Sequence, residues 1–156
     1  MKSILFVCMG NICRSPTAEA VFRHALDRAG ISGITLDSAG TEAYHVGQAP
    51  DRRSIATARR HGIDMTALRA RQVVADDLQR FDVLLCADEV NLSALRRRFG
   101  EAGEAERHLL LPWLGIRTPR EVPDPYYEDD DAFEAVFSLL QDAAQRLCAR
   151  LGEPAA

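Results

Sequence analysis

Cys8 and Arg14 are the residues of this chain best suited to chemistry, and only the five residues MGNIC separate them in the segment VCMGNICRSP. A cysteine thiolate is a strong nucleophile, and a guanidinium matches two oxygens of a phosphate. A short loop that enters a helix can point successive backbone N–H groups at one place, where the helix dipole adds positive charge. The segment therefore predicts a binding site for a tetrahedral oxyanion, with Cys8 beneath it as the nucleophile.

The residues between Cys8 and Arg14 fit such a loop. Gly10 permits a close approach or a positive φ, and Asn11 tolerates the left-handed region better than most residues. We expect the backbone N–H groups of residues 9–14 to hold the oxyanion. The loop and its support are then formed by Met9, Gly10, Asn11, Ile12, Cys13 and Ser15.

Two of these side chains have alternative roles that the sequence leaves open. Ser15 can donate a hydrogen bond to the Cys8 thiolate, or it can cap a helix whose first residue is Pro16. Cys13 can fill apolar space beneath the loop, or it can form a reversible disulfide that shields Cys8 from over-oxidation.

The elements that must position this loop follow from the hydrophobic pattern. Residues 3–7 form a continuous apolar run, typical of a strand buried on both faces, and a helical pattern then runs to Gly30. Further strands are predicted at residues 34–40, at 81–87, and at 108–111, where Pro112 breaks the strand. Further helices are predicted at 52–61 and 89–99.

The last helix carries a long apolar stripe from Phe133 to Leu151, and Asp131 and Glu134 have the spacing of a capping box. Strands alternate with helices throughout. The pattern therefore predicts an α/β fold, with a single-domain, doubly wound, four-stranded parallel sheet flanked by helices. We expect the domain to span residues 1–152, followed by a frayed tail of residues 153–156.

Composition bounds the class of protein. The 156 residues are 47% hydrophobic and 27% charged, as in a soluble globular domain, and a net charge of -4 argues against nucleic acid as a partner. The four cysteines are too sparse for a disulfide framework. The apolar run at the N-terminus is too short for a signal peptide or a membrane span. These features predict a cytoplasmic protein with reduced thiols and no membrane contact.

Two other kinds of site fit the sequence poorly. The P-loop of nucleotide hydrolases needs a lysine in a G-x-x-x-x-G-K-[ST] pattern, and the only lysine here is Lys2. A zinc site needs C-x-x-C spacing or paired histidines, which the cysteines lack.

The segment VCMGNICRSP resembles the active-site signature of the low-molecular-weight protein-tyrosine phosphatases. The resemblance extends along nearly the whole chain, through DSAGT (37–41), HVG (45–47), HGID (61–64), ARQV (70–73), FDVLLCADEVNL (81–92) and DPYY (124–127). It implies that Cys8 attacks phosphorus to give a cysteinyl-phosphate, while Arg14 holds the phosphoryl oxygens. It also implies that Asp124 acts as general acid and then as base, and that no metal or other cofactor takes part.

The resemblance also bears on the substrate. Tyr44, Tyr126 and Tyr127 stand where the family lines its cleft, and aromatic walls favour phosphotyrosine over the shorter phosphoserine. Related phosphoarginine phosphatases carry Thr at the position of Ile12, whose apolar surface suits a phenyl ring. For Asp124 the plainer interpretation is a turn, because Asp before Pro commonly starts one.

Two rival functions remain beside phosphatase. A thiol-dependent arsenate reductase has a similar fold and loop, but it needs further cysteines to relay a disulfide. Cys86 is available at a strand end, but no second cysteine follows it within a short segment, and the next is Cys148. The other rival is a phosphate-binding or redox-sensing module without catalysis. The expected partner is a phosphotyrosine protein, and a bacterial-type tyrosine kinase is one candidate. The sequence leaves the physiological substrate and the oligomeric state open.

Overall fold

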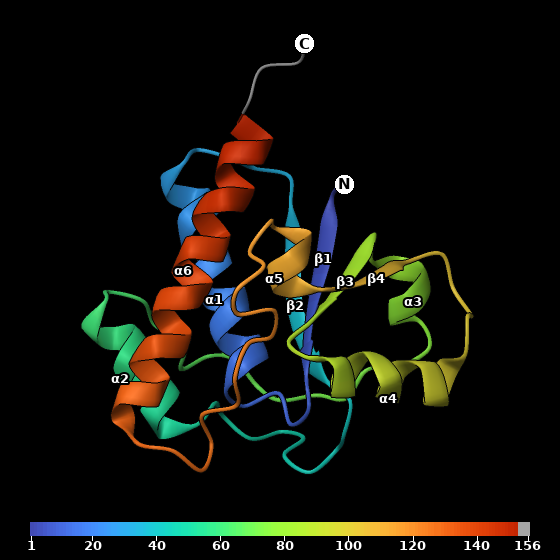
Figure 1. Cartoon of the computed structure of the whole chain (residues 1–156), viewed down its shortest axis with the longest axis horizontal. Coiled ribbons are helices and arrows are strands. Elements are labelled where there is room, and N and C mark those ends of the chain that lie inside the picture. The colour runs from blue at the N-terminus through green and yellow to red at the C-terminus, as the bar shows by residue number, and fades with distance from the viewer. Residues whose placement is uncertain (153–156) are drawn as a thin grey trace.

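A sheet of four parallel strands, in the order β2-β1-β3-β4, forms the centre of the molecule (Figure 1). The computed structural model describes residues 1–152, and the predicted frayed tail of residues 153–156 lies outside them. The strands are β1 (Ser3–Cys8), β2 (Thr35–Gly40), β3 (Val83–Cys86) and β4 (Glu106–Leu109). The predicted α/β fold with a four-stranded parallel sheet is confirmed.

Helices cover both faces of this sheet, as a doubly wound fold requires (Figure 1). On one face lie α1 (Arg14–Arg28), α2 (Arg52–Arg60) and α6 (Asp130–Gly152), and on the other lie α3 (Asp77–Arg80) and α4 (Glu89–Phe99). The neighbours of β1 are β2 on one side and β3 on the other. The carboxyl ends of β1 and β3 therefore form a topological switch point, where such folds bind ligands.

The buried side chains of β1 explain why its sequence is a continuous apolar run. Ile4 and Phe6 face α1 and α6, and the Phe6 ring packs on Phe22 with 4.7 Å between ring centroids. Leu5 faces the opposite way, into a cluster that includes Leu95 of α4. A strand with one exposed face alternates apolar and polar residues. Because both faces of β1 are covered, its residues are apolar without that alternation.

The long C-terminal helix buries its predicted apolar stripe, but it begins differently from the prediction. It starts at Asp130, and the carboxylate of Asp129 accepts a hydrogen bond from the Ala132 N–H at 3.2 Å. The predicted capping box of Asp131 and Glu134 is wrong, because the Glu134 carboxylate pairs with His61 beyond the end of α2, at 2.9 Å. The buried stripe contains Phe133, Val136, Phe137, Leu140, Ala144 and Leu147.

The segment around Pro112 also departs from its predicted strand. The strand β4 ends at Leu109, and a one-turn helix, α5 (Leu110–Trp113), follows at once. Pro112 lies inside this helix, where the missing N–H costs little because the first turn has no partner for it. The proline therefore does not break the strand; the strand has already ended.

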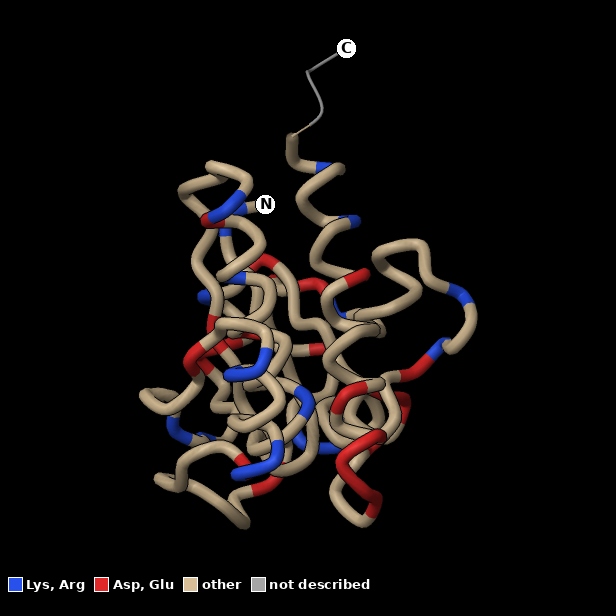
Figure 2. Tube along the Cα trace, turned by 90° about the vertical axis from the view of Figure 1, so that its left-hand side faces the viewer, with Lys and Arg blue, Asp and Glu red and all other residues tan. Residues whose placement is uncertain are grey.

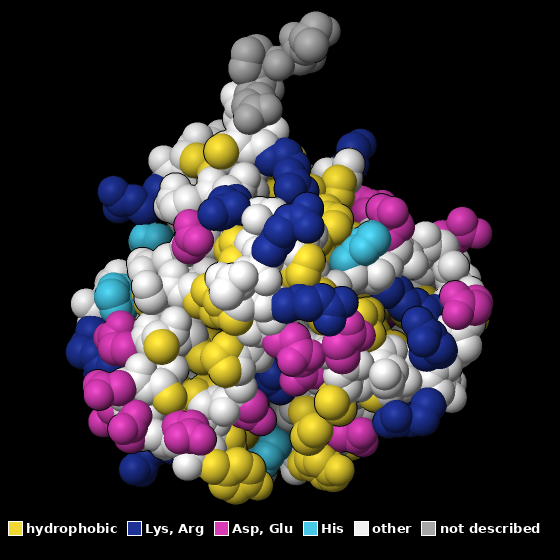
Figure 3. All heavy atoms as spheres, viewed as in Figure 1, with side chains coloured by type: hydrophobic (Ala, Val, Ile, Leu, Met, Phe, Trp, Pro, Cys, Tyr) yellow, Lys and Arg dark blue, Asp and Glu magenta, His cyan; other side chains and the backbone are white. Residues whose placement is uncertain are grey.

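Charges of both signs are spread along the whole trace, and the acidic run of residues 128–131 leads into α6 (Figure 2). Apolar side chains gather instead at the end of the molecule to which the strands' carboxyl ends point (Figure 3). The large exposed apolar residues include Met9, Tyr44, Val46, Tyr126 and Tyr127. Within residues 1–152, no helix is both long and apolar enough to cross a membrane.

Gly40, the last residue of β2, lies so close to the loop after β1 that a side chain at this position would meet the loop's backbone. A Cβ at this position would lie 2.6 Å from the Met9 carbonyl oxygen and 3.2 Å from the Asn11 nitrogen. Both neighbours are backbone atoms, so relief requires the loop itself to move. We expect Gly40→Ala to lower the free energy of unfolding by about 1–3 kcal/mol in urea denaturation.

Gly152→Ala provides the matched control, because a Cβ there would meet nothing within 4 Å. Its free energy of unfolding should stay within about 0.5 kcal/mol of the unsubstituted chain. Equal stabilities for the two variants would show that the close packing of β2 against the loop has no energetic weight.

Candidate active site

A pocket opens at the carboxyl end of β1, at the switch point of the sheet. Cys8 lies in its lining with only 3% of its surface exposed. Met9, Gly10, Ile12 and Cys13 also line it, whereas Asn11 and Ser15 are buried behind the loop. The pocket thus brings together Cys8, Arg14 and Asp124 with the predicted wall residues Tyr44, Tyr126 and Tyr127, and it adds His45, which the sequence did not single out.

The backbone of the loop is arranged to leave its donors free. Within the described part of the chain, none of the N–H groups of residues 9–14 donates to a protein acceptor. The carbonyls are turned outward and bound: those of Cys8, Met9, Ile12 and Cys13 accept from the N–H groups of Thr41, Glu42, Asp51 and Thr17, at 2.8–3.3 Å. A loop with bound carbonyls and unbound N–H groups is a ready-made anion site.

Asn11 makes this backbone path possible. Its φ of 57° lies in the left-handed region, and it is the only residue other than glycine with positive φ among those described. Its side chain is fully engaged: Nδ2 donates to Ser15 and Ser38, and Oδ1 accepts from the Arg71 N–H at 3.0 Å. The expected tolerance of asparagine for this region is confirmed, and the side-chain bonds hold the residue there.

Arg14 is a buried cation with a fixed direction, since only 4% of it is exposed. Its Nη1 donates to the Asp88 carboxylate at 2.7 Å and to the Val122 carbonyl at 3.0 Å, and its Nη2 lies 3.9 Å from Asp124. Burial lowers the pKa of Arg14, but the thiolate charge of Cys8 and the bond to Asp88 outweigh burial and raise it. The guanidinium is therefore a permanent charge at the pocket.

The structure resolves the two roles considered for Ser15. The helix α1 begins at Arg14, so Ser15 is already inside it, and no side chain caps the helix. The Ser15 hydroxyl lies 3.0 Å from the Cys8 sulfur and accepts from Asn11 at 2.8 Å. The N-cap interpretation, with Pro16 as the first helical residue, is wrong, because the hydroxyl is directed at the thiol.

Cys13 is packed as an apolar residue. It lies in a small buried cluster with Ile12, Ala70 and Phe133, and its thiol is free. Burial raises the pKa of Cys13 to about 12, with a further contribution from the Asp51 charge. This packing favours the role of filler beneath the loop, and a regulatory disulfide to Cys8 stays a prediction.

Asp124 lies in a turn and in the pocket lining at once, so its two interpretations are compatible. Its Oδ1 accepts from the Tyr126 N–H at 3.1 Å, and 48% of its side chain is exposed. Arg53 of α2 tethers this segment, donating to the carbonyls of Tyr126 at 2.9 Å and Glu128 at 3.3 Å. The turn points the carboxylate toward Arg14 while leaving it open to water.

The three tyrosines of the pocket are exposed rather than packed in the core. Tyr127 is 90% exposed and Tyr44 is 70% exposed, while Tyr126 packs edge-on against Tyr127 with 4.9 Å between ring centroids. Such rings at a pocket mouth offer apolar faces to an aromatic ligand.

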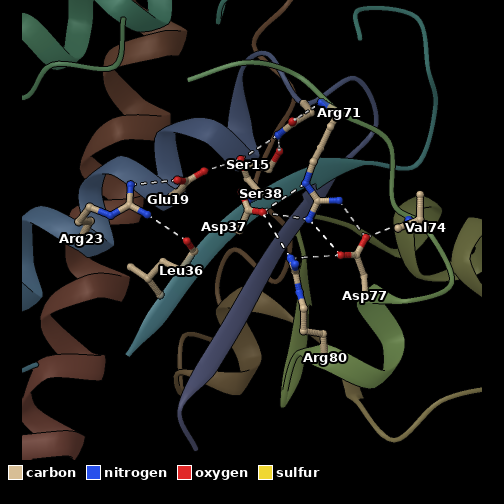
Figure 4. A network of polar contacts seen from close by, with 11 residues as sticks. Ser15, Glu19, Arg23, Leu36, Asp37, Ser38, Arg71, Val74, Asp77 and Arg80 are labelled. Carbon is tan, nitrogen blue, oxygen red and sulfur yellow. Dashed lines mark hydrogen bonds and ion pairs between the residues drawn. The ribbon is translucent and has the colours of Figure 1, made fainter. Parts of the chain in front are cut away.

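The sequence did not identify the residues that hold the site from behind. Asp88 orients Arg14, and Arg53 tethers the segment after Asp124. Ser38 and Arg71 bond to Asn11, and Glu19 accepts from Ser38 (Figure 4). Only Asp88 carried a usable signal, because it follows the strand that ends at Cys86. The others are far from the loop in sequence or lie on the hidden side of α1.

The remaining cysteines are placed away from the pocket lining. Cys86 is fully buried on the α3 and α4 side of the sheet, and Cys148 packs on the opposite side, on α6. Burial raises the pKa of both thiols. Neither thiol lines the pocket that contains Cys8. No cluster of three His, Cys, Asp or Glu side chains that could hold a metal ion occurs within residues 1–152.

Comparison with known proteins adds to this geometry. A family model described as "Low molecular weight phosphotyrosine protein phosphatase" matches residues 3–156. The Homo sapiens protein of that name is 44% identical over 140 residues, which cover 87% of this chain and 87% of the relative.

Two solved structures have closely similar folds. YfkJ from Bacillus subtilis is 38% identical, with a TM-score of 0.88 over 97% of this chain and 95% of that one. DARP, the drosophila arginine phosphatase, is 27% identical, with a TM-score of 0.88 over 99% of this chain and 100% of that one. A similar fold is thus found in a protein named an arginine phosphatase, while the human relative is named a phosphotyrosine protein phosphatase.

Asp88 offers a test of how Arg14 is oriented. The Asp88 carboxylate caps α4 by accepting from the Asn91 N–H at 2.9 Å. In Asp88→Asn the amide oxygen can still accept this bond, but the negative charge that faces Arg14 is lost. We expect hydrolysis of an aryl phosphate to slow by about tenfold or more, and inhibition by inorganic phosphate to weaken.

Glu89→Gln is the matched control, because it removes the adjacent charge, which faces Arg120 on the surface at 2.6 Å. Its rate and phosphate inhibition should equal those of the unsubstituted enzyme. If Asp88→Asn behaved like this control, the contact between Asp88 and Arg14 would have no role in holding phosphate.

Proposed function

Because the chain belongs to the low molecular weight phosphotyrosine protein phosphatase family and is a protein-tyrosine phosphatase, we propose that it works through a cysteinyl-phosphate at Cys8 without a metal ion. One observation carries this mechanism. The pocket that Cys8 lines also contains Arg14 and Asp124, and the N–H groups of residues 9–14 in the adjoining loop donate to no acceptor among the described residues. These are a nucleophile, an oxyanion site and a proton donor in one place.

In the first step, the Cys8 sulfur forms a bond to phosphorus as the bond to the tyrosine oxygen breaks. The N–H groups of residues 9–14 and Arg14 bind the three equatorial oxygens, whose charge they stabilise in the transition state. The Ser15 hydroxyl, 3.0 Å from the sulfur, stabilises the thiolate before attack. The positive charge that a metal ion would supply comes from Arg14 and the backbone.

Asp124 serves both steps of the reaction. It first donates its proton to the departing phenolate oxygen, and as a carboxylate it then takes a proton from the water that attacks the phosphocysteine. Inorganic phosphate leaves, and the Cys8 thiolate and the protonated Asp124 are restored. The exposure of this side chain at the pocket mouth supports access of that water.

The pocket walls support phosphotyrosine as the substrate. Tyr44 and Tyr126 offer aromatic faces, and Ile12 places an apolar side chain in the lining. We infer that the physiological partner is a phosphotyrosine protein, with an autophosphorylating bacterial-type tyrosine kinase as one candidate. The four free thiols support a reducing compartment such as the cytoplasm as its location.

The roles of Cys8 and Asp124 predict different kinetic signatures. Cys8→Ser should abolish aryl phosphate hydrolysis, and rapid quenching of the unsubstituted enzyme should trap phosphate on Cys8, detectable by mass spectrometry. Asp124→Asn should slow the hydrolysis of an aryl phosphate with a poor leaving group, such as an unsubstituted phenol, by about a hundredfold or more. The effect on nitrophenyl phosphate should be smaller, because nitrophenolate leaves without being protonated.

The control for the acid is Glu128→Gln, which removes a neighbouring charge from the same segment. It should leave both substrates unaffected. Full activity in Cys8→Ser would contradict the proposed mechanism, and equal effects of Asp124→Asn on good and poor leaving groups would remove the general-acid role.

A substrate panel tests specificity and metal independence together. We expect hydrolysis of phosphotyrosine peptides, undiminished by a chelator, with phosphoserine and phosphoarginine peptides at least about tenfold slower. Thioredoxin-coupled arsenate reduction should be absent. Turnover that required a divalent metal, or that favoured phosphoarginine or arsenate, would overturn the proposal.

A further inference from the structure

Arg53 of α2 takes no part in the mechanism proposed above, yet its side chain is held in a fixed direction. Its guanidinium pairs with the Asp51 carboxylate through two hydrogen bonds, from Nε to Oδ1 and from Nη2 to Oδ2, each 3.0 Å long. The same carboxylate accepts from the Arg53 N–H at 2.8 Å and caps the start of α2. A bidentate pair of this kind fixes the plane of a guanidinium as well as its position.

Two further hydrogens of this guanidinium bind the segment that carries Asp124. Nη2 donates to the Tyr126 carbonyl at 2.9 Å, and Nη1 donates to the Glu128 carbonyl at 3.3 Å. Figure 1 shows this segment passing the start of α2 before it enters α6. The guanidinium also lies over the rings of Tyr126 and Phe133, 5.6 Å and 4.4 Å from their centroids.

Arg53 is the tie between the two ends of this segment. At one end the Val122 N–H donates to the Ala87 carbonyl at 2.9 Å, and at the other end the chain enters α6. Among the described residues, no hydrogen bond other than the two from Arg53 joins residues 123–128 to the rest of the chain. The bond from the Tyr126 N–H to Asp124 lies within the turn, so it cannot place the turn relative to the pocket.

Asp51 connects the same arginine to the oxyanion loop. Its N–H donates to the Ile12 carbonyl at 2.8 Å, and its side chain is only 12% exposed. Asp51 thus binds the loop through its backbone and Arg53 through its carboxylate, and Arg53 binds the turn. A general acid works only within hydrogen-bond reach of the departing oxygen, so a fixed connection between the loop and the turn determines that reach.

We propose that Arg53 is a positioning residue for the general acid: paired with Asp51, it holds the turn that carries Asp124 at a fixed place relative to the loop of residues 9–14. This inference rests on the proposed role of Asp124 as the proton donor. Arg53 is not part of the pocket lining, so its effect on the reaction passes through the turn.

The test compares two leaving groups in Arg53→Gln. Glutamine offers a single NH2 group, which cannot pair with Asp51 and also bind both carbonyls. We measure kcat/KM, which reports the steps up to phosphoryl transfer. For phenyl phosphate, whose leaving group needs a proton, it should fall by about tenfold, and for nitrophenyl phosphate by about twofold at most.

Binding of phosphate separates the turn from the loop. The bond from the Asp51 N–H to the Ile12 carbonyl joins two backbones and is retained in Arg53→Gln. Inhibition by inorganic phosphate should therefore stay within about twofold of the unsubstituted enzyme.

The double variant shows whether the effect passes through the acid. Once Asp124→Asn has removed the proton donor, the position of the turn no longer matters for protonation of the leaving group. Adding Arg53→Gln to Asp124→Asn should then leave the ratio of kcat/KM for the two substrates unchanged, because the two residues act in series.

Asp51→Asn weakens the same connection from the other side. The asparagine can still cap α2, and its N–H still binds Ile12, but the charge that holds Arg53 is lost. The slowing should again be selective for phenyl phosphate, by about two- to fivefold. Thermal unfolding reports which variants fold, and Asp51→Asn carries the test if Arg53→Gln does not.

Arg52→Gln is the matched control. It removes the same charge from the neighbouring residue of α2, whose side chain is exposed, and leaves the pairing of Arg53 intact. Its kcat/KM should match that of the unsubstituted enzyme for both substrates.

Equal slowing of the two substrates in folded Arg53→Gln, or rates equal to those of the control, would overturn the inference while leaving Asp124 as the acid. Equal effects of Asp124→Asn itself on the two substrates would instead remove the acid role on which the inference rests. The two failures therefore give different results.

Discussion

The rest of the site depends on keeping the N–H groups of residues 9–14 unbonded. A backbone that leaves donors free must satisfy its carbonyls elsewhere, and here three neighbouring segments do so. The residues after β2 bind the carbonyls of Cys8 and Met9, Asp51 before α2 binds that of Ile12, and α1 binds that of Cys13. The segments that follow β2 and precede α2 therefore shape the loop without entering the chemistry.

The main positive charge beside this loop is that of Arg14. Arg14 is the single buried cation of the pocket, and Asp88 and the Val122 carbonyl hold one of its nitrogens. Its other terminal nitrogen remains near Asp124, at 3.9 Å, a separation too long for a strong pair. A phosphoryl group can therefore take up the free side of the guanidinium without breaking the contacts that orient it.

The sequence predicted the parts of the site that lie close together along the chain. Cys8, the loop and Arg14 could be recognised because a strand, a turn and a helix follow one another there, and Asp124 was found through the resemblance. The support behind the loop could not be predicted, because Glu19 meets Ser38 only once α1 packs on β2. Short elements were also missed: α5 and the start of α6 are set by local contacts such as that of Asp129 rather than by hydrophobic spacing.

The pairing of Arg71 with Asp37 and Asp77 illustrates the same limit. Nothing in the sequence links these three charges, yet Asp77 is only 2% exposed and the three side chains fasten the segment that orients Asn11. Polar residues behind a catalytic loop have no periodic pattern, so only the folded structure reveals which of them meet.

The central claim, that residues 9–14 and Arg14 hold a tetrahedral oxyanion directly over Cys8, is tested most directly by a crystal structure with orthovanadate. The account predicts vanadium bonded to the Cys8 sulfur, with its equatorial oxygens bound by the N–H groups of residues 9–14 and by Arg14. Vanadate bound elsewhere, or held at Cys8 without those N–H groups, would contradict it.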